Sequence, residues 1–107
     1  MKIELLHFDG CPSHERFLLR LRELLALAGV DAPVEQRRVE CEAAAAHERF
    51  LGSPTLRVDG VDVEPGAGGR TDYGLKCRLY RTADGLRGTP SDESVLDALQ
   101  RPVGSAS

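Results

Sequence analysis

The stretch KIELLHFDGCPSHERFLLRLRELLALAG, residues 2–29, contains the strand and the helix from which the rest of the fold follows. Its first part, residues 2–8, is short and rich in apolar residues, which favours a buried β-strand that an Asp-Gly pair then breaks. From Ser13 onward apolar residues recur at helical spacing until Gly29, so the sequence predicts an amphipathic helix. Ser13 is the predicted N-cap, because its hydroxyl can accept an N–H bond from the first turn.

The remainder of the chain predicts short strands, two more helices and a second hairpin. The predicted elements are a strand at 34–39, a helix at 40–51, strands at 55–58 and 61–64, an extra hairpin within 77–88 and a helix at 91–100. The first two strands are joined by a helix and should be parallel, whereas Asp59-Gly60 favours an antiparallel hairpin. The sequence therefore predicts an α/β fold, β-α-β-α-β-β-α, with a mixed sheet, helices on both faces and an extra hairpin before the last helix.

Length and composition indicate one globular domain. The chain has 107 residues, of which 41% are hydrophobic and 29% charged, which is ordinary for a folded domain. We expect residues 1–101 to form the domain. Residues 102–107 are predicted to be a flexible tail, because Pro102 cannot continue a helix.

Charge and hydropathy argue against two classes of partner. The net charge is −3, from 14 basic and 17 acidic residues, whereas nucleic-acid-binding domains are usually basic. No apolar run approaches the roughly 20 residues of a membrane helix, and the N-terminus has no long apolar stretch of the signal-peptide kind. The sequence predicts a cytoplasmic protein with neither a nucleic-acid nor a membrane partner, and it leaves the oligomeric state open.

Three cysteines, Cys11, Cys41 and Cys77, carry the candidate chemistry. An odd number at wide spacing does not fit a secreted disulfide framework, and the sequence has no paired CxxC or HxxxH zinc signature. Cys11 comes just before the first predicted helix, where free N–H groups and the helix dipole favour an anion, so a reactive thiolate is expected there. The alternative is a small buried residue at the end of a strand.

The order of elements, together with DGCPSH at 9–14 and GSPT at 52–55, resembles the thioredoxin-like fold. The segments FLGSPTLRVDGV and LKCRLYRTADGLRG are similar to small bacterial thioredoxin-family proteins, some of which are catalogued as alkylmercury-lyase-like. The resemblance implies a cis proline that faces the reactive cysteine, and in this chain that residue is Pro54. His14 stands where the family has the second cysteine of its CxxC motif, so dithiol exchange within the motif is impossible.

The leading hypothesis is a thiol-dependent, thioredoxin-like protein that acts as a thiol–disulfide oxidoreductase on a small thiol or a protein disulfide. Cys11 is the expected nucleophile and Cys77 its candidate partner, because exchange needs a second sulfur within reach. His14 either stabilises the Cys11 thiolate or is a solvated residue of the first helical turn. By the resemblance, Pro54 would present its neighbouring backbone to a bound thiol or peptide. Whether the chain is an enzyme is left open.

Two other interpretations of the same residues remain open. Cys11, Cys77 and Cys41 are candidate ligands for a soft metal ion such as mercury or zinc, because thiolates select such ions. That site would belong to a metal-binding module or to an organomercurial lyase-like protein, and no other cofactor is expected. For Cys41, an ordinary position at the start of the second helix is favoured. The last interpretation is an interaction module that has lost its chemistry.

Several other polar residues are predicted to be ordinary structure. Asp9 is a candidate proton donor near the thiol, but a turn-forming role before Gly10 is favoured. His7 and His47 are predicted to be structural or at the surface. A solvated basic face is the default interpretation of five residues in the second half of the chain: Arg70, Lys76, Arg78, Arg81 and Arg87.

Overall fold

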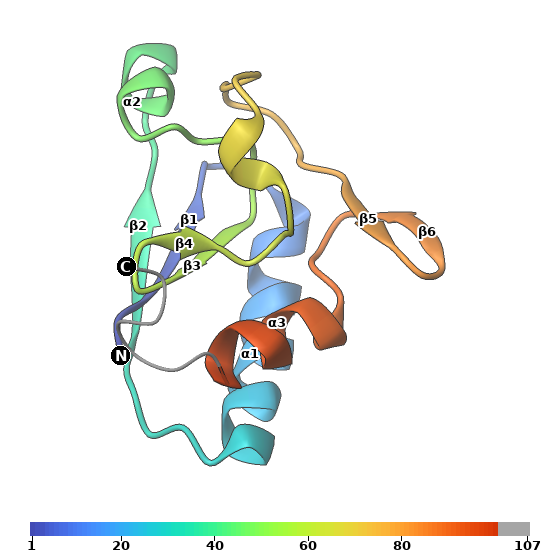
Figure 1. Cartoon of the computed structure of the whole chain (residues 1–107). Helices are drawn as coiled ribbons and strands as arrows, with labels where there is room; N and C mark the ends of the chain where they lie inside the picture. Colours follow the sequence, from blue (N-terminus) through green and yellow to red (C-terminus); the bar gives the residue numbers. More distant parts are fainter. Residues whose placement is uncertain (101–107) are drawn as a thin grey trace.

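A four-stranded mixed sheet lies at the centre of the fold (Figure 1). The computed structural model describes residues 1–100, so the predicted tail at 102–107 lies outside the described residues. The strands are β1 Ile3–His7, β2 Val34–Arg38, β3 Thr55–Val58 and β4 Val61–Asp62, in the order β2-β1-β3-β4. β1 is parallel to β2 and antiparallel to β3, and β3 is antiparallel to β4. The predicted mixed sheet is confirmed.

Helices and a separate hairpin complete the described part of the chain. Within residues 1–100 the α-helices are α1 Pro12–Ala28, α2 Glu42–His47 and α3 Asp92–Gln100, and a short 3-10 helix, η1, spans Ala67–Gly69. β5 Tyr80–Thr82 and β6 Gly85–Arg87 form a second, two-stranded sheet, which projects from the body in Figure 1. This is the extra hairpin predicted before the last helix.

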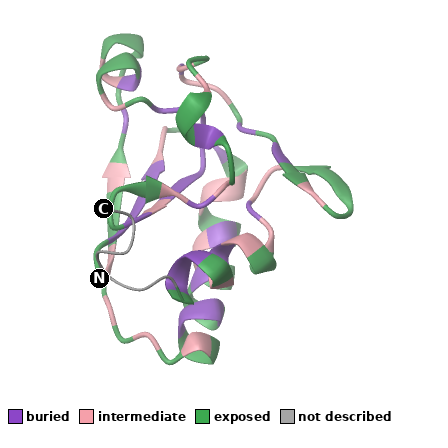
Figure 2. Cartoon of the chain, in the orientation of Figure 1, coloured by how far each residue is buried: buried purple, intermediate pink, exposed green. Residues whose placement is uncertain are grey.

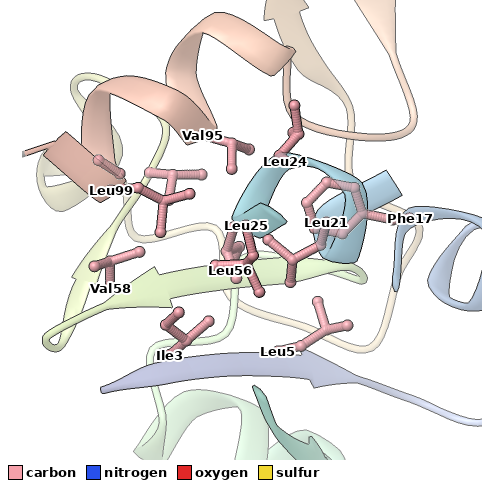
Figure 3. Packing of buried hydrophobic residues seen from close by; sticks show 12 residues of the cluster. Ile3, Leu5, Phe17, Leu21, Leu24, Leu25, Leu56, Val58, Val95 and Leu99 are labelled. Atoms are coloured by element: carbon pink, nitrogen blue, oxygen red, sulfur yellow. The ribbon is translucent and has the colours of Figure 1, made fainter. Parts of the chain in front are cut away.

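The sheet has helices on both faces, as the sequence predicts. Alternation of side chains along β1 sends Ile3 and Leu5 to one face and Leu6 to the other. On the first face these residues and β3 pack against α1 and α3, forming the larger core (Figure 3). On the second face Leu6 packs with Ala45 of α2 and with Phe50. Figure 2 shows the buried residues concentrated between these layers.

The first helix begins two residues earlier than predicted. Cys11, not Ser13, is the N-cap, and Pro12 occupies the first helical position. Proline suits that position because its φ is already helical and its missing N–H would have no partner there. Ser13 therefore lies inside the first turn. At the other end Gly29 adopts a left-handed φ of 68° and ends the helix as predicted.

The second helix is shorter than the predicted 40–51. It ends at His47, because the chain turns at Arg49, whose φ is 55°. The Arg49 N–H then bonds the Ala46 carbonyl at 3.2 Å and the Phe50 N–H bonds the Ala45 carbonyl at 2.8 Å. This pattern closes a helix C-terminus and directs the next residue into the core.

Candidate functional site

Cys11 lies at the junction between β1 and α1. The chain leaves β1 and turns at Gly10, whose φ of 91° is readily adopted by glycine. Cys11 is a free cysteine, 9% exposed, and its side chain makes no capping hydrogen bond. The first N–H groups of the 17-residue helix have no partners within the helix. Cys11 thus lies at the end of the helix that carries these unpartnered N–H groups.

Pro54 lies just before β3, at the end of the sheet from which the chain turns to Cys11. Leu6 pairs with Thr55 at the end of the β1–β3 register. Because the strands are antiparallel, β1 runs past this pair towards Cys11, while the chain before Thr55 comes from Pro54. The Ser53–Pro54 peptide bond is cis, which is the geometry that the resemblance implied for Pro54.

Cys77 lies beside the residue that precedes Pro54. Ser53 and Cys77 form an isolated parallel bridge. The Ser53 N–H donates to the Lys76 carbonyl at 2.8 Å, and the Arg78 N–H donates to the Ser53 carbonyl at 3.0 Å. Cys77 itself is exposed and free. The two segments on which the resemblance rested, GSPT and KCR, thus pack side by side.

These contacts occupy the backbone next to Pro54. Both main-chain groups of Ser53 bond to residues 76 and 78, and the Tyr80 hydroxyl donates to the Pro54 carbonyl. Burial raises the pKa of Tyr80 above its usual range, which keeps the hydroxyl proton in place. The position where the resemblance implies a bound thiol or peptide is therefore taken by the chain's own segment around Cys77.

Gly52 allows this close packing. A Cβ atom at Gly52 would lie 2.9 Å from both the Arg78 Cβ and the Lys76 carbonyl oxygen, closer than Cβ atoms come in proteins. The φ of Gly52, 124°, is also in the region that favours glycine. The glycine at this position thus permits the register that puts Cys77 beside Ser53.

Arg78 is buried, so its assignment to a solvated basic face is wrong. Arg78 is 1% exposed. Its guanidinium donates to both oxygens of Asp62 at 2.7 and 3.0 Å and to Glu64 at 3.1 Å. It also lies 4.2 Å from the centre of the Tyr80 ring. A charge can be buried when such partners replace water. Arg78 and Tyr80 are two residues apart and share one side of this segment. The inward Tyr80 is therefore the sequence signal for the burial of Arg78 that was missed.

His14 contacts the sheet. Its ring stacks on His7, with centroids 3.7 Å apart and planes 10° apart, and its Nε2 lies 3.1 Å from the Gln36 Oε1. Among the hydrogen bonds of residues 1–100, none joins His14 to Cys11. Burial, and next the charge of His14, lower the pKa of His7. Side chains alternate along β1, which puts His7 on the face that α1 covers. This position was a sequence signal for the contact with His14, and it was missed.

Cys41 and Asp9 lie at the same end of the sheet but are exposed. Cys41 is the N-cap of α2, which agrees with the favoured position at a helix start. Asp9 lies in the turn after β1, and its carboxylate is 3.4 Å from Arg38. In the part of the chain that the structure describes, no group of three or more His, Cys, Asp or Glu side chains is arranged to hold a metal ion. A three-cysteine ligand set is thus not assembled here.

The segments that precede the three cysteines meet at a small cavity. Its volume is about 280 Å³ and its lining comes from the ends of β1 and β2 and from the loop before Cys77: Phe8, Asp9, Arg38, Val39, Glu40 and Leu75. The Leu75 N–H also bonds the Glu42 Oε1 at 3.1 Å, which ties this loop to the start of α2. The topology therefore brings all three cysteine-bearing segments to one end of the sheet.

The projecting hairpin borders the same site. A Cβ atom at Gly88, just after β6, would lie 3.1 Å from the Ser13 hydroxyl in the first turn of α1. The segment 77–88 thus begins beside Ser53 and ends beside the helix start that carries Cys11. Leu79 and Leu86 are 58% and 62% exposed on this segment, so the segment carries exposed apolar side chains.

Comparison of the chain with protein-family models, with curated proteins and with solved structures gives no match. No helix within residues 1–100 is long and apolar enough to cross a membrane. The geometry around the cysteines is therefore the basis for assigning a function.

Proposed function

We propose that this chain is a cytoplasmic thiol–disulfide oxidoreductase with a thioredoxin-like fold, in which Cys11 and Cys77 form a reversible disulfide. One observation carries the proposal. The backbone beside Pro54, where the resemblance implies a bound thiol, is paired with residues 76 and 78, and an exposed cysteine lies between them. Cys77 is thus presented to the Cys11 end of the sheet by the chain itself.

The arrangement of the elements supports the thioredoxin-like assignment. The sheet order β2-β1-β3-β4, with β1 parallel to β2, agrees with the β-α-β-α-β-β-α order from which the resemblance was drawn. α1 and α3 pack on one face and α2 packs on the other. This layout puts the start of α1 and the start of β3 at one end of the sheet, which is the end that carries the two cysteines of the proposal.

The proposed exchange has two steps. The Cys11 thiolate attacks one sulfur of a substrate disulfide, the S–S bond breaks, and the leaving sulfur takes the electron pair and a proton from solvent. The Cys77 thiolate then attacks the Cys11 sulfur of the mixed disulfide and releases the second substrate thiol. The substrate gains the two electrons that the cysteine pair loses, and an external thiol reductant restores the dithiol.

This mechanism explains the absence of a second cysteine in the CPSH motif. His14 occupies that position and packs on His7, so the resolving thiol has to come from another segment. Cys77 is the candidate that is both exposed and held at the correct end of the sheet. Cys41 is exposed as well, but it is the N-cap of a separate helix and is not bridged to Ser53.

A thiol map tests the proposal. The reduced protein is treated with oxidised glutathione, alkylated and digested, and its peptides are identified by mass spectrometry. We expect a linked Cys11–Cys77 peptide pair that disappears after reduction, with Cys41 still alkylated or carrying glutathione. Cys41→Ser is the matched control and should retain the linked pair, whereas Cys11→Ser and Cys77→Ser should lose it.

Two results would contradict the oxidoreductase proposal. If Cys11 and Cys77 stay unlinked under conditions in which Cys41 becomes glutathionylated, the two thiols do not act as a pair. If they stay unlinked while the wild-type chain retains one equivalent of Hg²⁺ that Cys11→Ser does not, the soft-metal alternative replaces the proposal.

A further inference from the structure

The main chain of Cys77 presents an unpaired edge. The Lys76 carbonyl and the Arg78 N–H both point to Ser53. The peptide units on either side of Cys77 are trans, and in a trans unit the C=O and the N–H point in opposite directions. The N–H and the C=O of Cys77 therefore both point away from Ser53. Within residues 1–100 neither group has a hydrogen-bond partner, so both can pair with an extended chain.

The side chains after Cys77 alternate between exposed and buried positions. Arg78 and Tyr80 are buried, whereas Leu79 and Arg81 are exposed, as Cys77 is. Side chains of an extended segment point alternately to opposite sides, so the three exposed residues share one side. We call this side the outward face. It carries a thiol, an apolar side chain that is 58% exposed, and a cation, each two residues from the next.

The two ends of this edge carry opposite charges. At one end the Leu75 N–H donates to the Glu42 Oε1 at 3.1 Å. At the other end is Arg81, and the hairpin that it belongs to carries one more cation, Arg87, and one carboxylate, Asp84. Neither Glu42 nor Arg81 forms an ion pair with any residue of the range 1–100. The edge therefore runs from an acidic to a basic end.

The ion pairs around this edge are balanced and leave its polarity unchanged. Three carboxylates pair with three cations: Asp62, Glu64 and Asp72 with Arg70, Lys76 and Arg78. One of these carboxylates, Glu64, also accepts the Arg81 N–H at 3.1 Å. The main chain available for pairing thus ends before Arg81, while the guanidinium of Arg81 keeps its charge unpaired.

We propose, on the basis of the oxidoreductase function above, that this edge binds a disulfide-bearing polypeptide as an antiparallel strand, with the substrate cysteine opposite Cys77. In an antiparallel pair one residue can exchange both hydrogen bonds with Cys77. Two residues before the substrate cysteine an apolar side chain contacts Leu79, and four residues before it a carboxylate pairs with Arg81. A carboxylate after the cysteine would meet Glu42 instead. A small disulfide makes fewer of these contacts, so a polypeptide is the preferred substrate.

Nuclear magnetic resonance titration of the reduced protein with redox-inert peptides tests the docking without the chemistry. The probe is acetyl-Thr-Asp-Thr-Leu-Thr-Ser-Thr-amide, in which serine replaces the substrate cysteine. The control is the same peptide in reverse order, which puts the carboxylate on the Glu42 side. We expect the probe to shift the Cys77 amide in a saturable way and the reversed peptide to bind about tenfold more weakly. Equal binding of the two peptides, or no saturable shift, would overturn the proposal.

Two substitutions on the outward face locate the contacts. Leu79→Ala should weaken binding of the probe about fivefold through lost apolar contact. Arg81→Ala should weaken it about threefold, because a single exposed ion pair contributes little. Leu27→Ala is the matched control, since this leucine is 74% exposed on α1 and should not affect binding. Unchanged binding by both variants would overturn the assignment, as would a Cys77 amide shift with protein concentration alone, which would indicate a second copy at the edge.

Disulfide reduction tests the docking and the proposed function separately. The reduced protein is mixed with the disulfide-linked dimer of the cysteine-containing probe or with oxidised glutathione, and the released thiols are measured. We expect the peptide to be reduced about tenfold faster. Equal rates would overturn the preference for a polypeptide and leave the oxidoreductase in place. If neither is reduced and Cys11 and Cys77 stay unlinked, the oxidoreductase proposal fails and this edge is not a substrate site.

Discussion

Arg78 shows how single residues hold the candidate site together. Its backbone N–H bonds Ser53, its guanidinium bonds Asp62 and Glu64, and its stem packs against Gly52. One side chain therefore connects the segment that bears Cys77 to the start of β3 and to the β4 loop. Because the guanidinium is buried, its partners depend on it for neutralisation.

Replacement of Arg78 is accordingly predicted to destabilise the whole domain. Arg78→Ala leaves Asp62 partly buried without its cation and leaves Glu64 with Arg70 alone, so the free energy of unfolding should fall by about 3–5 kcal/mol. Urea denaturation followed by circular dichroism measures the change. Arg81→Ala, an exposed arginine three residues along the chain, is the control and should change stability by less than about 0.5 kcal/mol. Similar small effects from both variants would mean that the buried network contributes little.

Among the secondary-structure elements, α1 links the sheet to the site. Cys11 caps its start, and His14 in its first turn stacks on His7 of β1. Two histidines in contact cannot both be charged without repulsion. The contact between α1 and the sheet at this end therefore depends on the protonation of the histidine pair.

The histidine pair predicts a pH dependence of stability. The pKa of His7 is lowered from 6.5, chiefly by burial and then by the charge of His14. His7 therefore binds a proton less tightly in the folded state than in the unfolded state. Its contribution to the free energy of unfolding is present above pH 6.5 and is lost as the pH falls through the lowered pKa. Unfolding free energies at pH 7.5 and 5.5 should differ more for the wild type than for His7→Gln.

His47→Gln is the control for this experiment. His47 is exposed at the end of α2, away from the stacked pair, and its replacement should leave the pH dependence of the wild type unchanged. If His7→Gln also keeps the wild-type pH dependence, the stacked pair does not couple folding to protonation.

For the molecule as a whole, the proposed disulfide would join the start of α1 to the segment that precedes the hairpin. A bridge between Cys11 and Cys77 closes a long loop that contains β2, α2, β3 and β4. Closing a loop of this length restricts the unfolded chain and stabilises the folded one by about 4 kcal/mol when the bridge fits without strain. Oxidation should therefore raise the melting temperature, and calorimetry of the oxidised and reduced forms measures it.

The cysteine variants separate this effect from other consequences of oxidation. Cys41→Ser should gain the same stability on oxidation as the wild type, while Cys77→Ser should gain none. An oxidised wild type with the linked peptides but no gain in stability would show that the bridge distorts the folded state.

Features that depend on neighbours along the chain were predictable from the sequence. The apolar spacing of α1, its termination at Gly29, the Asp59-Gly60 hairpin and the Ser91 cap of α3 all appear in the structure. Each depends on the conformational preference or hydrogen bonding of adjacent residues. The same local analysis placed Cys11 at a helix start, although it assigned the cap itself to Ser13 and extended α2 beyond Arg49.

Features that depend on distant segments required the folded molecule. The bonds of Arg78 to Asp62 and Glu64 and the pairing of Cys77 with Ser53 join residues that are far apart in sequence. A sequence indicates that arginine prefers water, but the fold determines whether carboxylates arrive to replace that water. Tertiary packing therefore set the partners of each functional side chain, because partner distance and burial are properties of the whole chain.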